Sequence, residues 1–443
     1  MSPRDHAGCA ISGSTPDALE AYEQALTAFL GWRSGAEVPL ARAVEAAPGF
    51  VMAHVLGAYG RVCSRDPDVV RSARALLQRA AALPSNDRER LHLAALRAAL
   101  DDDYESAKAL LGDVLAREPR DALALHVAHA FDHATGDATG LADRVAAVLP
   151  AWTPGLRGYP AVLAMHAFGL GESGAHAAAE AAARRSLELE PHNPRAHHVM
   201  AHVFEMTERV AEGERWLARH APQWSADSIV VTHGWWHLAL FQLAQGNLEG
   251  ALATYDRRVR DPRSVAVADL IDASALLWRI GLAGGAIGLR WRELAAAWAP
   301  HVDDRFCSFN DLHAMLAFVG AGDTARVRRL EKVLAAVQPL PTRHGRSTRE
   351  IGLPACRGIA AYGRADDARA IALLASLPEH AHRFGGSHAQ RDVLQLTLMA
   401  ASARLRRPAR RPRRERRVAL ARQAVQRWQL ATGRARTSAA VTP

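Results

Sequence analysis

Three segments of this 443-residue chain align without gaps around a shared histidine, and this regularity is the strongest constraint on its fold. The three segments are "AAPGFVMAHV" (46–55), "EPRDALALHV" (118–127) and "EPHNPRAHHV" (190–199). Their histidines, His54, His126 and His198, are each 72 residues apart, and a proline precedes each by six or seven positions. A repeat of this kind indicates that one structural unit recurs along the chain.

Half of this interval, about 36 residues, is close to the length of a tetratricopeptide helix pair. The intervening segments are rich in alanine, the best helix former, and they divide into partner helices such as 159–172 and 175–191. Single helix pairs cannot bury their apolar faces alone, so they stack. The sequence therefore predicts an all-α protein, a right-handed α-solenoid of atypical tetratricopeptide-like helix pairs with the first helix of each pair on the concave side.

The helical pattern loosens beyond about residue 260 but continues. Prolines and charges predict a loop at 338–350, and Ser387 is expected to cap the helix that follows it. No convincing domain boundary interrupts the pattern. We predict a flexible N-terminus (1–16), one solenoid (17–403), an arginine-rich linker (404–417) and a terminal helix with a tail (418–443).

The formal net charge of +9 is concentrated in residues 404–417, which contain nine arginines and are broken by Pro408 and Pro412. The rest of the chain is close to neutral. This distribution is typical of a solvated linker, so we expect no nucleic-acid partner.

The cysteines, Cys9, Cys63, Cys307 and Cys356, are far apart and form no CxxC pair, which favours a reducing compartment. The N-terminus has no secretory apolar region, and no apolar run reaches the length of a membrane span. We therefore expect a cytoplasmic protein without a membrane partner.

Histidines recur on the predicted first helices. His198, His202 and Glu205 have the spacing i, i+4 and i+7, which places them on one helical face, and His233 and His237 share a face on the next first helix. Neighbouring helices pack at roughly 8–10 Å, so these groups could converge. Neutral imidazole and carboxylate are ligands of zinc, iron or manganese. One hypothesis is a divalent-metal site made of His198, His202 and His237.

The alternative is that these histidines only pack between helices. Large apolar residues flank them in "HVFEM" and "HLALF", as packing would require. The HExxH zinc motif is absent, and the order here is HxxxHxxE. The chain has 21 histidines, so chance pairs at metal spacing are expected.

Several motifs resemble the bacterial relatives of the tetratricopeptide repeat protein 38 family. In chain order they are "AWTPGL", "HHVMAHVFEM", "THGWWHLALF", "ALATYD", "FNDLHAMLA", "GLPACRG" and "GGSHAQRDV". The resemblance covers about residues 20–405 and implies a solenoid of atypical repeats, without an established activity. It implies site residues at His198, His202, Glu205, His233, Trp236, His237, Asn310, Asp311, His313, Gln390, Arg391 and Asp392. His197 lies outside the family pattern.

Each candidate motif also has a structural interpretation. Trp236 could be core or groove wall. Arg391 could hold an anion beside a helix N-terminus or form an ion pair with Asp392. Asp311 and His313 would approach the histidine pairs only if the superhelix curls back.

Two functions follow from these patterns. The first is a binding module whose histidine-rich concave groove takes a peptide, a protein or a small polar ligand. The second is a metal-dependent enzyme, a hydrolase or oxidoreductase, that uses the His, Glu and Asp groups of the concave face. The repeat architecture favours the first, and the number of titratable groups in separate motifs favours the second.

Overall fold

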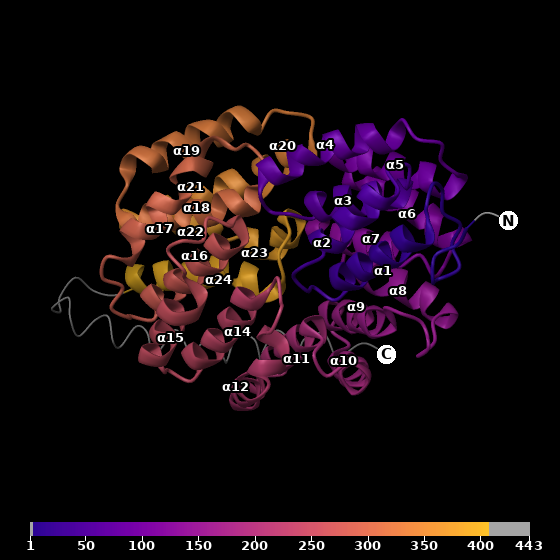
Figure 1. Ribbon diagram of the computed structural model, residues 1–443. Coiled ribbons are helices and arrows are strands. Elements are labelled where there is room, and N and C mark those ends of the chain that lie inside the picture. The colour runs from indigo at the N-terminus through magenta and orange to yellow at the C-terminus, as the bar shows by residue number, and fades with distance from the viewer. Residues whose placement is uncertain (1–2, 407–443) are drawn as a thin grey trace, which may run out of the picture. The chain divides into compact units, whose positions relative to one another are not determined.

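The computed structural model describes residues 3–406, and every regular element within them is a helix (Figure 1). This confirms the all-α prediction. Residues 407–417 of the predicted linker and the predicted terminal helix and tail (418–443) lie outside the described residues. Arg404 is described, and it belongs to the last helix of this range rather than to a linker.

The chain divides into two compact units. Unit 1 holds the residues up to Val203 together with Arg219–Val231, and unit 2 holds Phe204–Ala218 together with the residues from Thr232 onward. The sequence analysis placed no boundary here. The reason is that the first division falls inside one continuous helix, where no glycine, proline or polar run marks a linker.

Unit 1 is built from α1 (Pro16–Leu30), α2 (Glu37–Ala46), α3 (Val51–Val62), α4 (Pro67–Ala81), α5 (Asp87–Leu100), α6 (Tyr104–Arg117), α7 (Ala122–Thr135), α8 (Ala138–Val148), α9 (Tyr159–Glu172), α10 (His176–Leu189), most of α11 (Pro194–Met206) and α13 (Ala221–Ser225). Side-chain caps explain many of the starts. Asp103 caps α6, Asp121 caps α7, and Asn86 forms a capping box with Glu89 at the start of α5.

Unit 2 is built from α12 (Val210–Arg219), α14 (Val231–Ala244), α15 (Leu248–Thr254), α16 (Val267–Leu282), α17 (Arg290–Trp298), α18 (Ser308–Ala321), α19 (Thr324–Val337), α20 (Arg343–Ser347), α21 (Leu353–Gly363), α22 (Asp367–Leu374), α23 (Leu377–His380) and α24 (His388–Leu405). Two π-helical turns, Tyr255–Val259 and Thr348–Gly352, follow α15 and α20. Ser387 occupies the N-cap of α24, as predicted.

The loop predicted at 338–350 is wrong in its second half. Thr342 accepts a hydrogen bond from the Gly345 N–H at 3.0 Å and starts α20, which runs into the π-helical turn Thr348–Gly352. A threonine N-cap is a weak signal beside two prolines, so the prolines dominated the prediction.

Consecutive helices of unit 1 pack in pairs, α1 with α2, α3 with α4, α5 with α6, α7 with α8 and α9 with α10. One apolar core runs through these pairs and includes Tyr22, Phe50, Tyr59 and Phe131. In addition, α1 packs against α7, although these helices belong to pairs that are not neighbours. A simple solenoid makes contacts only between adjacent repeats. The pairing fits the predicted repeat, and the right-handed solenoid stays a prediction.

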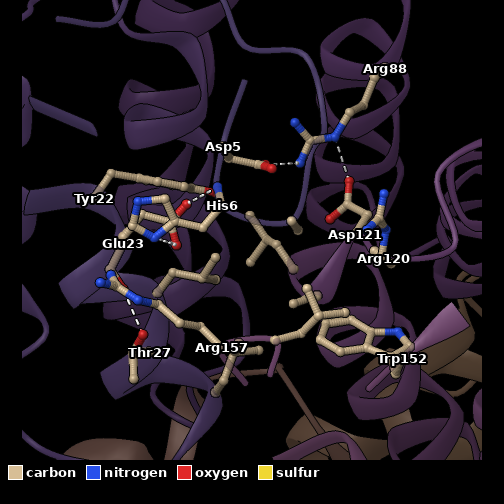
Figure 2. Close-up of a pocket in the computed structure, with 16 residues that line it drawn as sticks. Asp5, His6, Tyr22, Glu23, Thr27, Arg88, Arg120, Asp121, Trp152 and Arg157 are labelled. Carbon is tan, nitrogen blue, oxygen red and sulfur yellow. Dashed lines mark hydrogen bonds and ion pairs between the residues drawn. The ribbon is translucent and has the colours of Figure 1, made fainter. Parts of the chain in front are cut away.

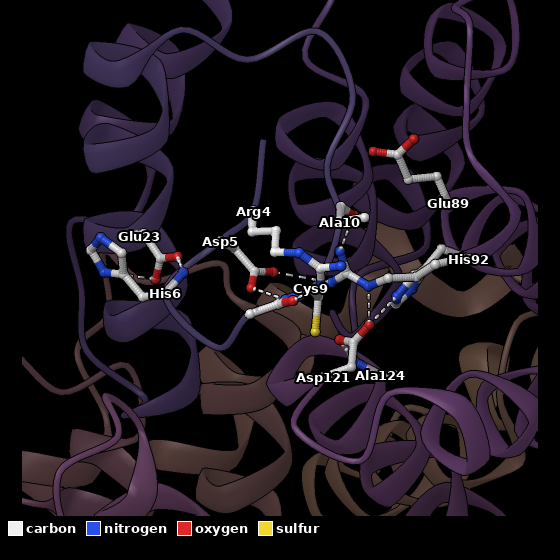
Figure 3. A network of polar contacts seen from close by, with 12 residues as sticks. Arg4, Asp5, His6, Cys9, Ala10, Glu23, Glu89, His92, Asp121 and Ala124 are labelled. Carbon is white, nitrogen blue, oxygen red and sulfur yellow. Dashed lines mark hydrogen bonds and ion pairs between the residues drawn. The ribbon is translucent and has the colours of Figure 1, made fainter. Parts of the chain in front are cut away.

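The segment before α1 is packed, although it was predicted to be flexible. Cys9 and Ile11 are buried, and the Cys9 N–H donates to Asp5 at 2.8 Å. A buried ion network holds this segment against α5 and α7 (Figure 3). Arg88 Nε donates to Asp121 at 2.6 Å, and Arg88 also donates to the Ala10 carbonyl at 3.1 Å.

A cavity of about 20 Å³ lies beneath this N-terminal segment (Figure 2). Tyr22 and Trp152 line it, and the buried Tyr22 hydroxyl has no partner among the described residues. A space of this size holds about one water molecule, which would satisfy the hydroxyl. The cavity is therefore too small to be the site of an organic ligand.

Unit 2 packs around α16 and α18, which contact each other and each contact further helices, α24 and α21 among them. Its core includes Trp236, Trp298, Phe309 and Phe318, all fully buried or nearly so. Among residues 3–406, no helix is both long enough and apolar enough to cross a membrane.

We predict that Asp121→Asn lowers the free energy of unfolding by about 3–5 kcal/mol, because Arg88 would remain charged and buried without its nearest carboxylate. Burial favours the neutral acid, but Arg88 and His92 outweigh it and hold the pKa of Asp121 well below its usual range. The contribution should therefore be complete above about pH 4 and be lost at more acidic pH. Urea unfolding at pH 7 and in acid measures both effects.

Asp103→Asn is the matched control, because Asp103 is also an N-cap, accepts from the Ser106 N–H at 3.1 Å, and is exposed. Asparagine caps helices about as well as aspartate, so this change should cost less than about 1 kcal/mol. Equal losses in the two variants would show that the buried ion network adds nothing to stability.

Candidate functional site

Helix α11 carries the first histidine pair. The Asn193 side chain accepts from the Ala196 N–H at 3.3 Å, and Pro194 is the first helical residue, so the helix starts with a polar cap and a proline. The position of this first turn determines which side chains of α11 share a face. His198 and His202 then lie one turn apart on the same face.

In unit 1 the rings of His198 and His202 converge. Their Nε2 atoms are 3.0 Å apart, and the ring planes are nearly perpendicular. Phe168 of α9 packs on both rings, and Trp32, just after α1, packs on His198. Two nitrogens bonded to one metal ion at about 2 Å each are roughly 3 Å apart, so this geometry suits a shared ion. We call His198 and His202 the α11 pair.

His197, and not His198, is the counterpart of His54. His54 Nε2 donates to the Pro48 carbonyl at 2.9 Å, and His197 Nε2 donates to the Pro191 carbonyl at 3.0 Å. The gapless alignment matched His198 to His54 and is therefore wrong by one residue at this position. The structural role of the repeated histidine passes to His197, so descent from the repeat does not account for His198.

Two other buried histidines of unit 1 bond to a carboxylate or to a backbone carbonyl. His92 donates to Asp121 at 2.9 Å, and His129 donates to the Met165 carbonyl at 3.1 Å. Burial, with Arg195 nearby, lowers the pKa of His129 to about 3, so this ring is neutral. These histidines are polar packing groups.

Helix α14 carries the second pair, His233 and His237, within unit 2. The His233 Nδ1 lies 3.0 Å from both carboxylate oxygens of Asp272 on α16 and donates to them. The His237 Nδ1 lies 3.7 Å from Glu205 Oε2. The two rings are 4.8 Å apart between centroids. We call His233 and His237 the α14 pair.

The Asp272 contact has a chemical consequence. Because the Nδ1–H of His233 is hydrogen-bonded to the carboxylate, the lone pair of the neutral ring is on Nε2. A carboxylate behind a histidine in this way fixes the tautomer and orientation of the ring, which is the usual support of a metal-bound imidazole.

Trp236 is fully buried in unit 2 and supports the α14 pair. The His233 ring stacks on it at 5.0 Å, and Arg279 of α16 lies 5.5 Å from its centroid. Arg279 in turn pairs with Asp392 on α24. The motif residue Asp392 is thus connected to His233 through Arg279 and Trp236.

Of the two interpretations of this motif, the ion pair between Arg391 and Asp392 is not formed, because Asp392 pairs with Arg279 within residues 3–406. Arg391 donates to the Gly386 carbonyl. Gln390 accepts from the Ser387 N–H at 3.0 Å as part of the capping box. Gln390 and Arg391 therefore both bond to the turn before α24.

On α18, Asn310, Asp311 and His313 are buried. His313 Nδ1 donates to the Phe309 carbonyl at 2.7 Å, and Asp311 lies 3.4 Å from His344 Nε2 on α20. Burial raises the pKa of Asp311 above its ordinary value, although His344 opposes this. Their convergence with the histidine pairs stays a prediction.

Sequence reasoning missed Asp272, Arg279 and His344. A signal existed for Asp272, since "LIDASALL" (270–277) is an apolar helical run interrupted by one carboxylate. A lone acid in such a run needs a partner. No local signal identifies His344, which lies in the segment predicted to be a loop.

No family model matches the chain. The resemblance to the tetratricopeptide repeat protein 38 family accordingly stays a prediction based on the motifs.

We predict that His54→Ala and His197→Ala each lower the free energy of unfolding by about 1–3 kcal/mol, because each leaves a proline carbonyl unpaired. Burial lowers the pKa of His197 to about 4. The unfolded state then binds the extra proton first, so stability falls as pH drops from about 6.5 towards 4. His197→Ala should reduce this acid sensitivity. Chemical unfolding with EDTA from pH 4.5 to 7.5 measures both effects.

His198→Ala is the matched comparison, one residue away on the same helix. It should cost less stability than His197→Ala and leave the acid slope due to His197 in place. A larger loss for His198→Ala than for His197→Ala would make His198 the packing residue and reverse the assignment.

Proposed function

We propose that the protein is a metal-binding helical protein that binds divalent transition-metal ions through its histidine pairs, His198 with His202 in unit 1 and His233 with His237 in unit 2. Within each pair the rings are close: the Nε2 atoms of the α11 pair are 3.0 Å apart, and the ring centroids of the α14 pair are 4.8 Å apart. Imidazole suits zinc, iron, copper or nickel, and the absence of a thiolate argues against a structural zinc site of the cysteine type.

The observation that best supports this proposal is the 3.0 Å approach of the two Nε2 atoms of the α11 pair. Without an ion, such an approach allows only one weak hydrogen bond between two neutral rings. With an ion, both lone pairs are used. In the α14 pair, the hydrogen bond from His233 to Asp272 orients the ring so that its second nitrogen can bind a metal.

Glu205 adds a carboxylate to the α14 pair. Its Oε2 lies 3.7 Å from His237 Nδ1, and His237 lies one turn from His233. Each histidine of this pair therefore lies beside a carboxylate, Glu205 for His237 and Asp272 for His233.

Burial favours a small ligand over a peptide. His202 and His237 are buried, and so is Trp236. A peptide groove needs side chains that remain exposed until the partner binds. We therefore prefer a metal with a small polar ligand to the peptide-binding or protein-binding module that the repeat pattern suggested.

A metal-dependent hydrolase or oxidoreductase is the catalytic form of this proposal. A bound metal would supply Lewis acidity and a more acidic water. The residues themselves supply orientation, since Asp272 fixes the tautomer of His233 and Trp236 fixes its ring. Glu205 is the carboxylate placed to accept a proton beside His237.

Metal analysis tests the proposal directly. Untagged protein, freed of metal and loaded with zinc or cobalt, should retain metal after desalting, and the melting temperature should rise with metal. His202→Ala and His237→Ala should each lower the amount of metal retained, because each removes one ligand of its pair. Binding should weaken below about pH 6.5, where imidazole protonates. His54→Ala should keep full retention, since its ring bonds to a carbonyl. Equal retention by wild type and both site variants would exclude the site.

Asp272→Asn tests the supporting carboxylate. It should weaken metal affinity roughly 10- to 100-fold without removing a ligand. The matched control is Asp311→Asn, which also removes a buried carboxylate from a histidine, His344, in the same unit. Competition with a zinc-binding dye measures both affinities. A loss of affinity in Asp311→Asn as large as in Asp272→Asn would instead support the predicted convergence of Asp311 with the histidine pairs.

A further inference from the structure

Unit 1 contains a buried arginine that no carboxylate neutralises. Arg195, in the first turn of α11, is 4% exposed and has no ion-pair partner among residues 3–406. Its Nη2 donates to His126 Nδ1 at 3.2 Å, and its Nε is buried without a hydrogen bond. Several of its N–H groups are therefore available to an acceptor that the chain itself does not provide.

The other buried arginine of unit 1 shows how the fold neutralises such a charge. Arg88 donates to Asp121 at 2.6 Å and lies 3.5 Å from Asp5. Figure 2 marks both contacts with dashed lines. Burial lowers the pKa of Arg195 to about 9, whereas Asp121 and Asp5 overcome burial and raise the pKa of Arg88. The two side chains are similarly buried, so the difference lies in the missing anion.

Trp32 is positioned under the Arg195 guanidinium. The centre of the guanidinium lies 3.9 Å from the ring centroid, and the other neighbour of the ring is His198 at 5.5 Å. Trp32 has a φ of 56°, in the left-handed region that large side chains avoid. Its carbonyl accepts from the Ile229 N–H at 2.9 Å, which holds the turn.

The ring does not replace a counter-ion. A tryptophan face attracts a cation, but it leaves the net charge in place and accepts none of the in-plane N–H groups. The fork formed by Nε and an Nη group matches two oxygens of a carboxylate or phosphate. The neighbouring imidazole of His126 is neutral, because burial and Arg195 keep its pKa below the ordinary value, so it does not compete for the anion.

We propose that Arg195 binds the carboxylate or phosphate group of a small anion, in a site walled by Trp32 and next to His198. The inference does not rest on the proposed metal, since no contact in it involves an ion. If the metal is also bound, the anion lies beside it and is the polar ligand of that site.

Thermal melts in EDTA test the anion site apart from the metal. Wild-type protein would be melted at pH 7.5 with increasing inorganic phosphate or acetate, at an ionic strength kept constant with chloride. We expect a saturable rise of roughly 2–4 °C with at least one of the two anions. The phosphate and acetate arms show which group the site prefers.

Arg195→Met removes the charge and keeps most of the volume, so the variant should fold and lose the anion-dependent rise. Arg195→Lys keeps the charge without the fork, and the midpoint for the anion should increase at least about tenfold. Arg120→Met is the control, since Arg120 is an exposed arginine of the same unit without an ion pair. It should keep the full rise. No anion-specific rise in wild type, or an equal rise in Arg195→Met, would overturn the proposal.

Discussion

A polar side chain buried between helices must find a hydrogen-bond partner, and this constraint explains the recurrence of histidine in the chain. His54 and His197 donate to proline carbonyls six residues before them, at the turn that precedes each helix. His129 and His313 donate to carbonyls of α9 and α18. His54 and His197 thus tie a helix to the turn before it, His129 ties α7 to α9, and His313 bonds within α18. These four buried histidines are therefore explained by packing.

The α11 and α14 pairs differ from these histidines in the type of partner. Their partners are other imidazoles or carboxylates, which are themselves titratable. A carbonyl accepts a bond at any pH, whereas a pair of imidazoles loses its bond when both protonate. Such an arrangement is costly for a purely structural role, because it makes the core sensitive to pH. His92 also bonds to a carboxylate, Asp121, so the type of partner alone does not mark a functional histidine. The α11 and α14 pairs are distinguished by two imidazoles one turn apart together with a titratable partner.

The helices could largely be predicted from the sequence because caps and propensity are local. The helix predicted at 159–172 matches α9 residue for residue, and the expected cap of α24 at Ser387 is present. The candidate site could be predicted only in part. His233 and His237 follow from spacing, but Asp272 lies 35 or more residues away on another helix, and only packing brings it to His233. The one-residue error at His197 has a related cause. Counting along the chain cannot show which imidazole reaches the Pro191 carbonyl, because that depends on where the capped helix starts.

The net charge of the chain likewise does not show how each buried charge is neutralised. Most of the net charge lies in residues 404–417, so the rest of the chain is nearly neutral in sum. Neutrality in sum does not mean that each buried charge is neutralised where it lies. The carboxylates of Asp5 and Asp121 both form ion pairs with Arg88, and Glu190 forms an ion pair with Arg33. Arg195 is left with a ring nitrogen and the face of Trp32. Apolar replacements are often tolerated at buried charged positions, so an arginine kept there without an acid needs a reason beyond stability. The proposed anionic ligand supplies that reason, and Trp32, which contacts both Arg195 and His198, links its site to the α11 pair.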